Sequence, residues 1–589
     1  MFADLGTTES APDLFMARVS VRIAGANGEG IESSGALLMD AAAKSGLHVF
    51  GHRGYQSVIR GGHVWYQVRL GDSALRSYGE GIDILVALNQ DAVTYQKSRL
   101  NENAIIIYDP SKTNVSDIDS SKYRLAGIPM LDIAMEASGD PIMRNIVAIG
   151  AVLRLVGIGI DKFGETVKKR FGKKGEKVVE GNMKAATSGY NYKGVGTVHK
   201  LAMDSVQRYV LDGNTAVALG AYAAGCKFYA AYPMTPATGV LHWFAAHESK
   251  GVMFKQTEDE IAAINMAVGA SFAGVRAMCG TSGGGFALMV EALGMAGMIE
   301  APIVVVESQR TGPSTGLPTK SGQADLLFAM HASHGEFPRI VVAPSSVADC
   351  FRISAEAFNL AERYQVPVLI LLDQYLSEHM ESVDNFDIDG IKMDRGRIVT
   401  ASDGRFKRYE FAEDGVSPRA FPGTKGLMHI ANSDEHDEYG DDRSDLLVGY
   451  DESIALRKRM HDKRMKKTES MLKKESAFVP KIMNENAEHF LVAFGSVAQA
   501  AVEAVEMLKS EGRSFGVISF DYIMPLDAER TKHMLEGKRL FNVEENYTGQ
   551  LAQVIMTETG IGMQGSILKY DGEPFTGAEI ARRALDLIR

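Results

Sequence analysis

One segment constrains the fold of this chain more than any other, the run VPVLILL at residues 366–372. It is apolar at every position, and it is too short to cross a membrane as a helix. A strand that is apolar on both faces suits a sheet that helices cover on both sides. A second strand-like segment, PIVVVES at 302–308, leads into a loop rich in hydroxyl groups and glycine. The sequence therefore predicts an α/β fold.

Similar alternations of strand-like and helix-like segments recur along the chain and indicate several domains. At roughly 150 residues per domain, the 589 residues suggest about three to five domains. The 60 glycines and only 17 prolines favour the tight turns of α/β folds over Pro-rich linkers. We predict an α/β domain at 1–195, a linker at 196–212, a second α/β domain at 213–385, an extended connection with a charged, solvated helix at 386–480, and a third α/β domain at 481–589. Within the first domain we expect strands at 63–70, 82–88 and 104–109 and a mostly helical stretch at 140–174.

Composition excludes several classes of protein. The net charge of −11 gives no indication of nucleic-acid binding. Three widely separated cysteines without a C-x-x-C spacing exclude a zinc ribbon and an iron–sulfur cluster held by this chain alone. The longest apolar run, 147–160, contains Arg154 and is too short to span a bilayer. The first residues lack the pattern of a signal peptide, so we expect a cytoplasmic protein that does not enter a membrane.

A glycine cluster follows the first predicted strand. Gly25, Gly28 and Gly30 stand before a helix-like segment, where free backbone N–H groups would suit a phosphate or another anion. Their spacing is G-x-x-G-x-G rather than the G-x-G-x-x-G of dinucleotide folds, which argues against a nicotinamide-dependent dehydrogenase. A purely structural turn is the alternative interpretation. Arg60 would add a cation to an anion site, but Glu29 would repel a phosphate.

The second predicted domain carries four polar motifs next to its apolar segments. They are Tyr232-Pro233-Met234-Thr235-Pro236, the acidic helix start around Glu258, the glycines Gly283 and Gly284 before a helix, and the loop from Ser308 to Thr319 with Arg310. Open α/β sheets bind ligands at the carboxyl ends of their strands. A guanidinium there suits bidentate binding of a carboxylate. Each motif also has a purely structural interpretation, a rigid turn, a helix cap or a tight turn.

Together, YPMTPAT, QTEDEIAAI, TSGGG and SQRTGPSTGLPT resemble the alpha subunits of the 2-oxoacid:ferredoxin oxidoreductases, especially the 2-oxoglutarate type. The segment GANGEG resembles the gamma domain of that family, here fused in front of alpha, and the end of the chain, with Glu544-Glu545-Asn546, also fits. The resemblance implies a gamma-type α/β domain, a pyrimidine-type thiamine-diphosphate domain and a transketolase-C-like domain. It covers almost the whole chain.

The resemblance also implies roles for single residues. Glu258 would contact the aminopyrimidine ring of thiamine diphosphate, and Tyr232, Pro233, Gly283 and Gly284 would line that end of the cofactor. Thr235 and Arg310 would hold the 2-oxoacid, and Thr319 would help to recognise its distal end. The glycine cluster with Arg60 would bind coenzyme A or another anion. No metal ligands are expected on this chain.

The chain lacks the Gly-Asp-Gly motif that holds Mg²⁺ and the diphosphate in thiamine enzymes. The resemblance places this motif and a 4Fe-4S cluster on a beta subunit, and it implies ferredoxin as electron acceptor and an (alpha–beta)2 heterotetramer. The expected reaction converts 2-oxoglutarate and CoA to succinyl-CoA and CO2. A paralogue for a branched-chain or aryl 2-oxoacid and a non-catalytic scaffold subunit are the alternatives.

Two further features have structural interpretations. The acidic segment 434–438 cannot easily converge on one ion and is expected to be a solvated or partner-facing loop. Cys226 and Cys279 stand among small apolar residues and are expected to be packed thiols.

Overall fold

The computed structural model describes residues 18–55, 61–443 and 445–589. They belong to two units. The first runs through Leu211 and includes His379–Asn385 and Thr576–Ala578, and the second contains Asp212–Glu378, Phe386–Phe575 and Glu579–Arg589. No helix in the described ranges is long and apolar enough to cross a membrane.

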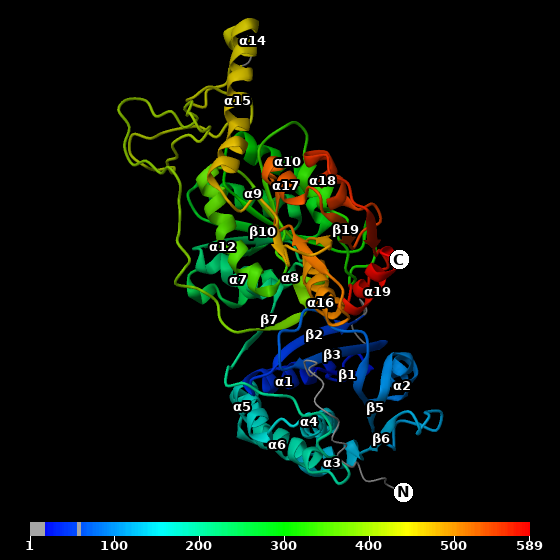
Figure 1. Ribbon diagram of the computed structural model, residues 1–589. Coiled ribbons are helices and arrows are strands. Elements are labelled where there is room, and N and C mark those ends of the chain that lie inside the picture. Colours follow the sequence, from blue (N-terminus) through cyan, green and yellow to red (C-terminus); the bar gives the residue numbers. More distant parts are fainter. Residues whose placement is uncertain (1–17, 56–60, 444) are drawn as a thin grey trace. The chain divides into compact units, whose positions relative to one another are not determined.

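The first unit is built on a mixed sheet, which has eight strands among the described residues in the order β6-β5-β4-β1-β3-β2-β14-β7 (Figure 1). The strands are β1 (Arg18–Ala26), β2 (His48–Gly54), β3 (His63–Gly71), β4 (Ile82–Ala87), β5 (Leu100–Tyr108), β6 (Arg124–Gly127), β7 (Tyr209–Asp212) and β14 (Met380–Val383). The predicted strands at 63–70, 82–88 and 104–109 are confirmed as β3, β4 and β5. β14 pairs with β2 although about 330 residues separate them, a pairing that no local pattern shows.

Helices cover both faces of this sheet. They are α1 (Ile31–Lys44), α2 (Gln90–Gln96), α3 (Met130–Ser138), α4 (Arg144–Leu155), α5 (Ile160–Phe171) and α6 (Glu176–Tyr190). The stretch predicted to be mostly helical at 140–174 is confirmed as α4 and α5 with short 3-10 turns. Apolar side chains of α1, α4 and α5 share one core with β1 and β3, and α2 packs on the opposite face.

The second unit contains a sheet of seven strands, counted among the described residues, in the order β18-β12-β13-β11-β10-β8-β9. The strands are β8 (Phe228–Ala231), β9 (Met253–Gln256), β10 (Ala277–Thr281), β11 (Val304–Gln309), β12 (Ile340–Val342), β13 (Val368–Asp373) and β18 (Tyr522–Met524). All neighbours pair in parallel except β12 and β18. The helices are α7 (Gly213–Ala223), α8 (Thr238–Ala246), α9 (Glu260–Phe272), α10 (Gly283–Met298), α11 (Leu326–His331), α12 (Val347–Tyr364) and α13 (Gln374–Glu378). The apolar run 366–372 thus lies mainly in β13, whose residues are all buried.

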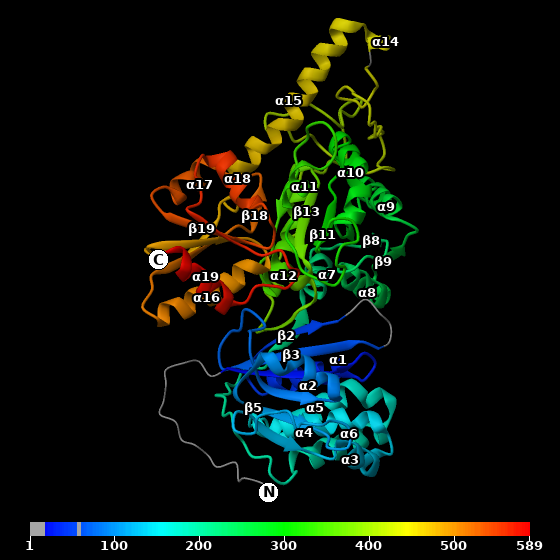
Figure 2. The ribbon, with the colours of Figure 1, turned by 90° about the vertical axis from the view of Figure 1, so that its right-hand side faces the viewer.

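The carboxyl-terminal domain of this unit adds a second sheet, with five strands among the described residues in the order β15-β17-β16-β19-β20. Its strands are β15 (Lys481–Met483), β16 (His489–Ala493), β17 (Phe515–Ser519), β19 (Arg539–Glu544) and β20 (Gly565–Leu568). Its helices are α16 (Ser496–Ser510), α17 (Ala528–Leu535), α18 (Gln550–Thr559) and α19 (Gly577–Leu587). One core contains side chains of both sheets, for example Val305 of β11 and Val492 of β16, so the two sheets are packed together (Figure 2).

Helices α14 (Asp445–Val448) and α15 (Tyr450–Lys474) follow the long connection, and Figures 1 and 2 both show the outer part of α15 extending from its unit. The prediction of a solvated helix is wrong for one face of α15. Lys463 and Lys467 are buried and form ion pairs with Glu300, which is fully buried. Sequence alone could not show this face, because Glu300 lies more than 160 residues earlier.

The acidic segment 434–438 also differs from the expected solvated loop. His436 is buried, and its ring lies 4.1 Å from that of Tyr409. Glu435 pairs with Arg464 and Arg457 of α15, both at 3.1 Å. The segment is therefore packed against the basic helix, because its carboxylates neutralise cations that would otherwise lie next to one another.

Candidate active site at the carboxyl ends of four strands

The sheet topology brings the four polar motifs of the second domain together. Strands β11, β10, β8 and β9 are successive neighbours and run in parallel. Their carboxyl ends therefore meet along one side of the sheet, which we call the strand-end edge. The residues that follow them are Arg310 after β11, Ser282 after β10, Tyr232–Pro236 after β8 and Thr257–Glu260 after β9. Open parallel sheets hold ligands at such an edge.

Arg310 connects two of these motifs directly. Its Nη1 donates a hydrogen bond of 2.7 Å to the carbonyl oxygen of Thr235. Arg310 and Thr235 are both half-buried, and burial lowers the pKa of the guanidinium below its ordinary value. No carboxylate in the described part of the chain forms an ion pair with Arg310. A half-buried cation of this kind is suited to bind an anionic ligand.

Two glutamates near the start of α9 have opposite environments. Asp259 is the N-cap, and its side chain accepts a hydrogen bond from the Ala262 N–H at 2.8 Å. Glu258 precedes the cap and is exposed, whereas Glu260 follows it and is only 3% exposed. The Thr281 hydroxyl donates to Oε1 of Glu260 at 3.4 Å. The structure thus places Glu258 in solvent and Glu260 inside the edge, a distinction that sequence reasoning missed.

The start of α10 accommodates buried carboxyl groups because its first residues are glycines. A Cβ at Gly285 would lie 2.4 Å from Oε1 of Glu260, and a Cβ at Gly283 would lie 2.5 Å from Oδ2 of Asp325. Gly284 faces open space. The Ser282 hydroxyl is buried and has no hydrogen-bond partner within the described ranges. A side chain at position 283 would therefore collide with the carboxyl of Asp325, whereas Gly284 leaves room for the approach of a ligand.

Glu307 lies in the same region, at the fully buried end of β11 beside Thr281 in register. Burial raises its pKa well above the ordinary range, and the neighbouring Asp325 carboxyl raises it further. Burial also raises the pKa of Asp325 to about 6. Neighbouring acids with raised pKa values are found most often at functional sites.

The other predicted residues lie at or near this edge. Tyr232 is 40% exposed, and Pro233 beside it is half-buried. Thr319 is half-buried near the base of the loop that begins at Arg310. The loop closes on itself, since the Thr311 N–H donates to the Lys320 carbonyl oxygen at 3.1 Å.

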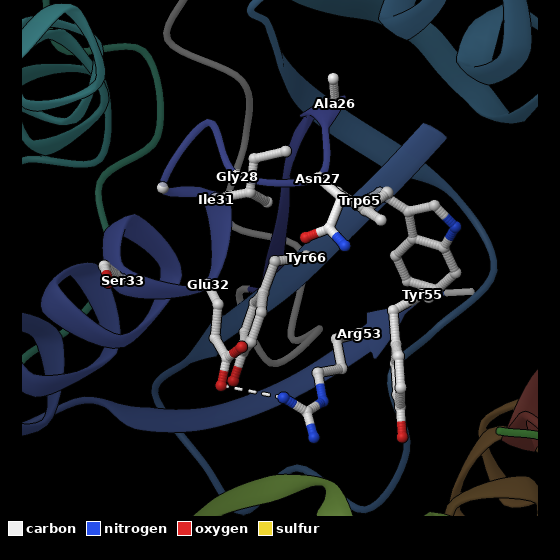
Figure 3. Close-up of a pocket in the computed structure, with 13 residues that line it drawn as sticks. Ala26, Asn27, Gly28, Ile31, Glu32, Ser33, Arg53, Tyr55, Trp65 and Tyr66 are labelled. Atoms are coloured by element: carbon white, nitrogen blue, oxygen red, sulfur yellow. Dashed lines mark ion pairs between the residues drawn. The ribbon is translucent and has the colours of Figure 1, made fainter. Parts of the chain in front are cut away.

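The first unit has a separate cavity of about 570 Å³, which Figure 3 shows in detail. Gly28 and Gly30 of the glycine cluster line it, both with positive φ angles of 95° and 79°. Arg53 lies in the cavity wall, where it forms an ion pair of 2.9 Å with Glu32 and stacks over the Tyr55 ring at 4.6 Å (Figure 3). The α1 N-terminus at this cavity has no side-chain cap. These groups suit a ligand with both anionic and aromatic parts.

Of the described residues of that cluster, Gly25 and Glu29 are not part of the cavity lining. The Oε2 of Glu29 accepts a hydrogen bond from the Ala26 N–H, and its Oε1 pairs with Arg144 at 2.5 Å. The carboxylate of Glu29 is thus paired with a cation of its own domain, which weakens the repulsion of a phosphate that the sequence led us to expect. Gly25 leaves room for this carboxylate, since its Cβ would lie 2.5 Å from Oε2. Arg60 lies outside the described residues.

The expectation of packed thiols is confirmed for Cys226 and Cys279. Both are free and buried, and burial raises the pKa of each thiol to about 12. Thiols of this kind are poor metal ligands and poor nucleophiles.

Comparison with known families gives three matches in the order of the domains. Residues 20–192 match the family described as pyruvate ferredoxin/flavodoxin oxidoreductase. Residues 219–454 match the thiamine-diphosphate-binding domain of pyruvate flavodoxin/ferredoxin oxidoreductase. Residues 480–567 match the transketolase C-terminal domain. The fold and its strand-end edge thus belong to the class of thiamine-dependent oxidoreductases.

Whole-chain relatives narrow this class. The chain is 32% identical to a 2-oxoacid:ferredoxin oxidoreductase subunit alpha from a Sulfolobus species, over 97% of each protein. It is 28% identical to the 2-oxoglutarate oxidoreductase subunit KorA of Mycobacterium tuberculosis, over 97% of this chain and 92% of that one. A solved structure of 2-oxoglutarate:ferredoxin oxidoreductase from Magnetococcus marinus, with 2-oxoglutarate, coenzyme A and succinyl-CoA bound, is also similar. It has 34% identity and a TM-score of 0.90, over 97% of this chain and all of that one.

These matches confirm the resemblance that the four motifs indicated. The chain belongs to the family of 2-oxoacid:ferredoxin oxidoreductase alpha subunits.

Proposed function

We propose that this alpha subunit takes part in the oxidative decarboxylation of 2-oxoglutarate with CoA to succinyl-CoA and CO2, with electrons passed to ferredoxin in a reversible reaction. The observation that carries this proposal is the half-buried Arg310, a cation without a carboxylate partner among the described residues, at the strand-end edge of the thiamine-diphosphate domain. The similarity to the Magnetococcus marinus enzyme supports 2-oxoglutarate as the substrate.

The edge fits the pyrimidine end of thiamine diphosphate. Tyr232 and Pro233 would form one wall and Gly283 and Gly284 the other, where Gly284 leaves open space. The unpartnered Ser282 hydroxyl supplies a polar group for a ligand. When bound, the cofactor stabilises the carbanion that decarboxylation of a 2-oxoacid leaves behind.

A carboxyl at the start of α9 would exchange a proton with the aminopyrimidine ring. Glu258 is the residue expected from the motif, and we keep it as the candidate. Hydrogen bonds of a general acid or base often form only when the ligand is bound. Glu258 is exposed where a beta subunit would complete the site and makes no side-chain hydrogen bond or ion pair to the described residues, whereas Glu260 is buried against α10 and bound to Thr281.

Arg310 would bind the carboxylate next to the keto group of the substrate. Its bond to the Thr235 carbonyl oxygen uses Nη1 and leaves the other nitrogens of the guanidinium for the ligand. Thr235 would hold the 2-oxoacid head together with Arg310, and Thr319 would contact the distal end from the same loop.

A beta subunit would supply Mg²⁺, the diphosphate site and the 4Fe-4S cluster. This chain has no Gly-Asp-Gly motif, and its three cysteines are buried and far apart in sequence. Large apolar side chains are exposed in the first two turns of the helices that begin at the edge, namely Ile261 of α9 and Leu288 of α10. A partner subunit would cover this surface, and two such pairs would form the (alpha–beta)2 heterotetramer.

The cavity of the first unit would bind coenzyme A. Its uncapped helix start and Arg53 suit phosphate groups, and Tyr55 and Trp65 offer ring faces to an adenine. This assignment gives the glycine cluster a role that is compatible with the bonding of Glu29 within the domain.

The test is a comparison of substrates with the alpha chain co-expressed with its beta subunit. We expect CoA-dependent reduction of ferredoxin or viologen with 2-oxoglutarate, and much lower kcat/KM with pyruvate, branched-chain and aryl 2-oxoacids. A preference for one of those acids would favour a paralogue. Absence of turnover with every 2-oxoacid at full cluster content would favour a scaffold subunit.

A further inference from the structure

The loop that follows β11, which we call the Arg310 loop (residues 310–322), is exposed at its tip and fixed at its base. Residues 312–317 are exposed, whereas Ser321 and Gly322 are buried. The Thr311 hydroxyl donates to the Ser321 carbonyl oxygen at 2.6 Å. A Cβ at Gly322 would lie 3.3 Å from the Thr311 nitrogen and 3.5 Å from the Arg310 carbonyl carbon. The position of Ser321 and Gly322 therefore sets the backbone of Arg310 and Thr311.

The base of this loop is held by the carboxyl-terminal domain rather than by its own sheet. The Ser321 hydroxyl donates to Oε2 of Glu545 at 2.6 Å, and both residues are only 3% exposed. The Ser321 N–H donates to the Gly572 carbonyl oxygen at 3.1 Å. Lys320 forms an ion pair with Glu573. Three neighbouring contacts thus tie the Arg310 loop to one domain that contributes no strand-end motif.

Glu545 is the centre of this arrangement. Its Oε1 accepts a hydrogen bond from the Phe575 N–H at 3.0 Å, so the same carboxyl joins the segment of Gly572 and Glu573 to Ser321. Its backbone carbonyl oxygen accepts a bond of 2.8 Å from the Gln323 N–H. The catalytic machinery proposed above does not use Glu545.

We propose that Glu545 is a positioning residue, which acts from the carboxyl-terminal domain through Ser321 to fix the Arg310 loop and so sets the affinity for the 2-oxoacid. The inference rests on the proposed role of Arg310 in binding the substrate carboxylate. Glu545 does more than join two domains. It bonds to Ser321, and Ser321 and Gly322 contact the backbone or side chain of Arg310 and Thr311.

Ionisation of Glu545 gives the proposal a second readout, the pH dependence of KM. Burial raises its pKa to about 8, the negative Asp373 at the end of β13 raises it further, and Lys569 of the same domain opposes the rise. At pH 7 the carboxyl is mostly protonated. The hydrogen bonds from the Ser321 hydroxyl and the Phe575 N–H also lower this pKa, so they favour the ionised form and strengthen when the carboxyl ionises above pH 8.

The test uses the full alpha–beta complex. Glu545→Ala and Ser321→Ala should each raise KM for the 2-oxoacid by about tenfold and change kcat at saturation by less than about twofold, because they displace a binding group. Glu545→Gln keeps a hydrogen-bond acceptor for Ser321, and the amide is uncharged like the protonated carboxyl at pH 7. The KM of this variant at pH 7 should therefore equal that of the parent. Above pH 8 the KM of Glu545→Gln should exceed that of the parent, because only the ionised carboxyl of the parent gains a charge-assisted bond from Ser321.

Gln550→Ala is the matched control. Gln550 lies in the same domain and also makes two hydrogen bonds across the same contact. Its Oε1 accepts from the Leu327 N–H at 3.0 Å, and its Nε2 donates to the Ala324 carbonyl oxygen at 2.7 Å. These bonds reach the chain after the Arg310 loop. An equal rise of KM in Gln550→Ala would overturn the proposal, as would an unchanged KM in Glu545→Ala.

Amide hydrogen exchange separates this proposal from the proposed function. The Thr311 N–H is bonded to the Lys320 carbonyl oxygen and should exchange faster in Glu545→Ala and Ser321→Ala than in the parent or in Gln550→Ala. Unchanged exchange would overturn the positioning role even if KM rises. Faster exchange in a complex that does not use 2-oxoglutarate would retain the positioning role and contradict only the proposed substrate.

Discussion

Two groups of buried carboxyls in the second unit have opposite surroundings. Glu300 and Glu362 are surrounded by cations, with Glu300 paired to Lys463 and Lys467, and Glu362 paired to Arg276 and Arg419 at 2.7 Å. By contrast, Glu260, Glu307 and Asp325 have no cationic partner in the described part of the chain. All five side chains lie within one polypeptide unit and most are almost fully buried.

Glu300 and Glu307 show how these surroundings affect the pKa of a buried carboxyl. Burial alone would raise the pKa of Glu300, but Lys463, Lys467 and Arg408 outweigh it and hold that pKa well below its ordinary range. The same burial has no opposing cation at Glu307, whose pKa is therefore raised. A buried charge is tolerated when it is paired, and an unpaired acid holds its proton instead.

The comparison indicates which buried acids serve stability and which serve the site. The paired glutamates join distant segments, since Glu300 anchors α15 and Glu362 binds Arg395 and Arg419 of the long connection. The unpaired acids gather at the edge where β10 and β11 end. Buried polar groups that lack partners mark the places where a sequence departs from optimal stability for function.

The largest expected effect separates the two glutamates of the α9 start. In the alpha–beta complex, Glu258→Gln should lower kcat by about 10² to 10⁴, because the amide cannot exchange a proton. Glu260→Gln keeps an acceptor for Thr281, should leave kcat almost unchanged and serves as the matched control. The measurement is 2-oxoacid-dependent viologen reduction at equal iron content. The reverse result, with only Glu260→Gln inactive, would move the catalytic role to Glu260.

This pair of glutamates also shows how far sequence reasoning reaches. Four ordered motifs were enough to predict the family, the α/β fold and the strand-end site. The orientation of single side chains was not predictable, because one helix cap decides it. Asp259 occupies the N-cap, and this leaves Glu258 outside the helix and turns Glu260 inward.

Other features depended on contacts between distant segments. The burial of Lys463 is visible only when Glu300 is placed beside it, and β14 joins β2 across most of the chain. Hydrophobic periodicity describes neighbours in sequence, so it cannot report such pairings. The charged helix was therefore predicted correctly as a helix and wrongly as solvated.

On the stability side of the comparison, Glu300→Gln should be strongly destabilising. It leaves Lys463 and Lys467 buried without a counter-charge, which costs about 3 to 5 kcal/mol. The measurement is chemical unfolding of the second unit, with Lys474→Met as a control for a solvent-exposed ion pair. An effect no larger than that of the control would show that the buried cluster does not anchor α15.

Arg310→Lys tests whether Arg310 binds a ligand, in contrast to the cations that pair with Glu300 and Glu362 inside the protein. Lys keeps the charge but loses the planar fork that binds a carboxylate with two bonds. We expect kcat/KM for the 2-oxoacid to fall by about 30- to 1000-fold, on the order of 2 to 4 kcal/mol, without loss of stability. Unchanged kinetics would remove Arg310 from substrate binding.

The smallest expected effect concerns Glu307 and Asp325 and has a definite sign. Because the pKa of each acid is raised in the folded protein, the folded state keeps protons that the unfolded chain releases as the pH rises above about 4. Stability contributed by this pair is therefore present at low pH and is lost as the pH rises through the folded pKa of Asp325, about 6. Glu307→Gln removes an acid that the fold keeps protonated over this range, so the loss of stability between pH 5 and 7 should shrink by about 1 to 2 kcal/mol. Thermal unfolding of the parent and the variant at both pH values measures this. A variant with the same pH dependence as the parent would mean that the fold does not hold a proton on Glu307, and the contrast between paired and unpaired acids would then fail on its unpaired side.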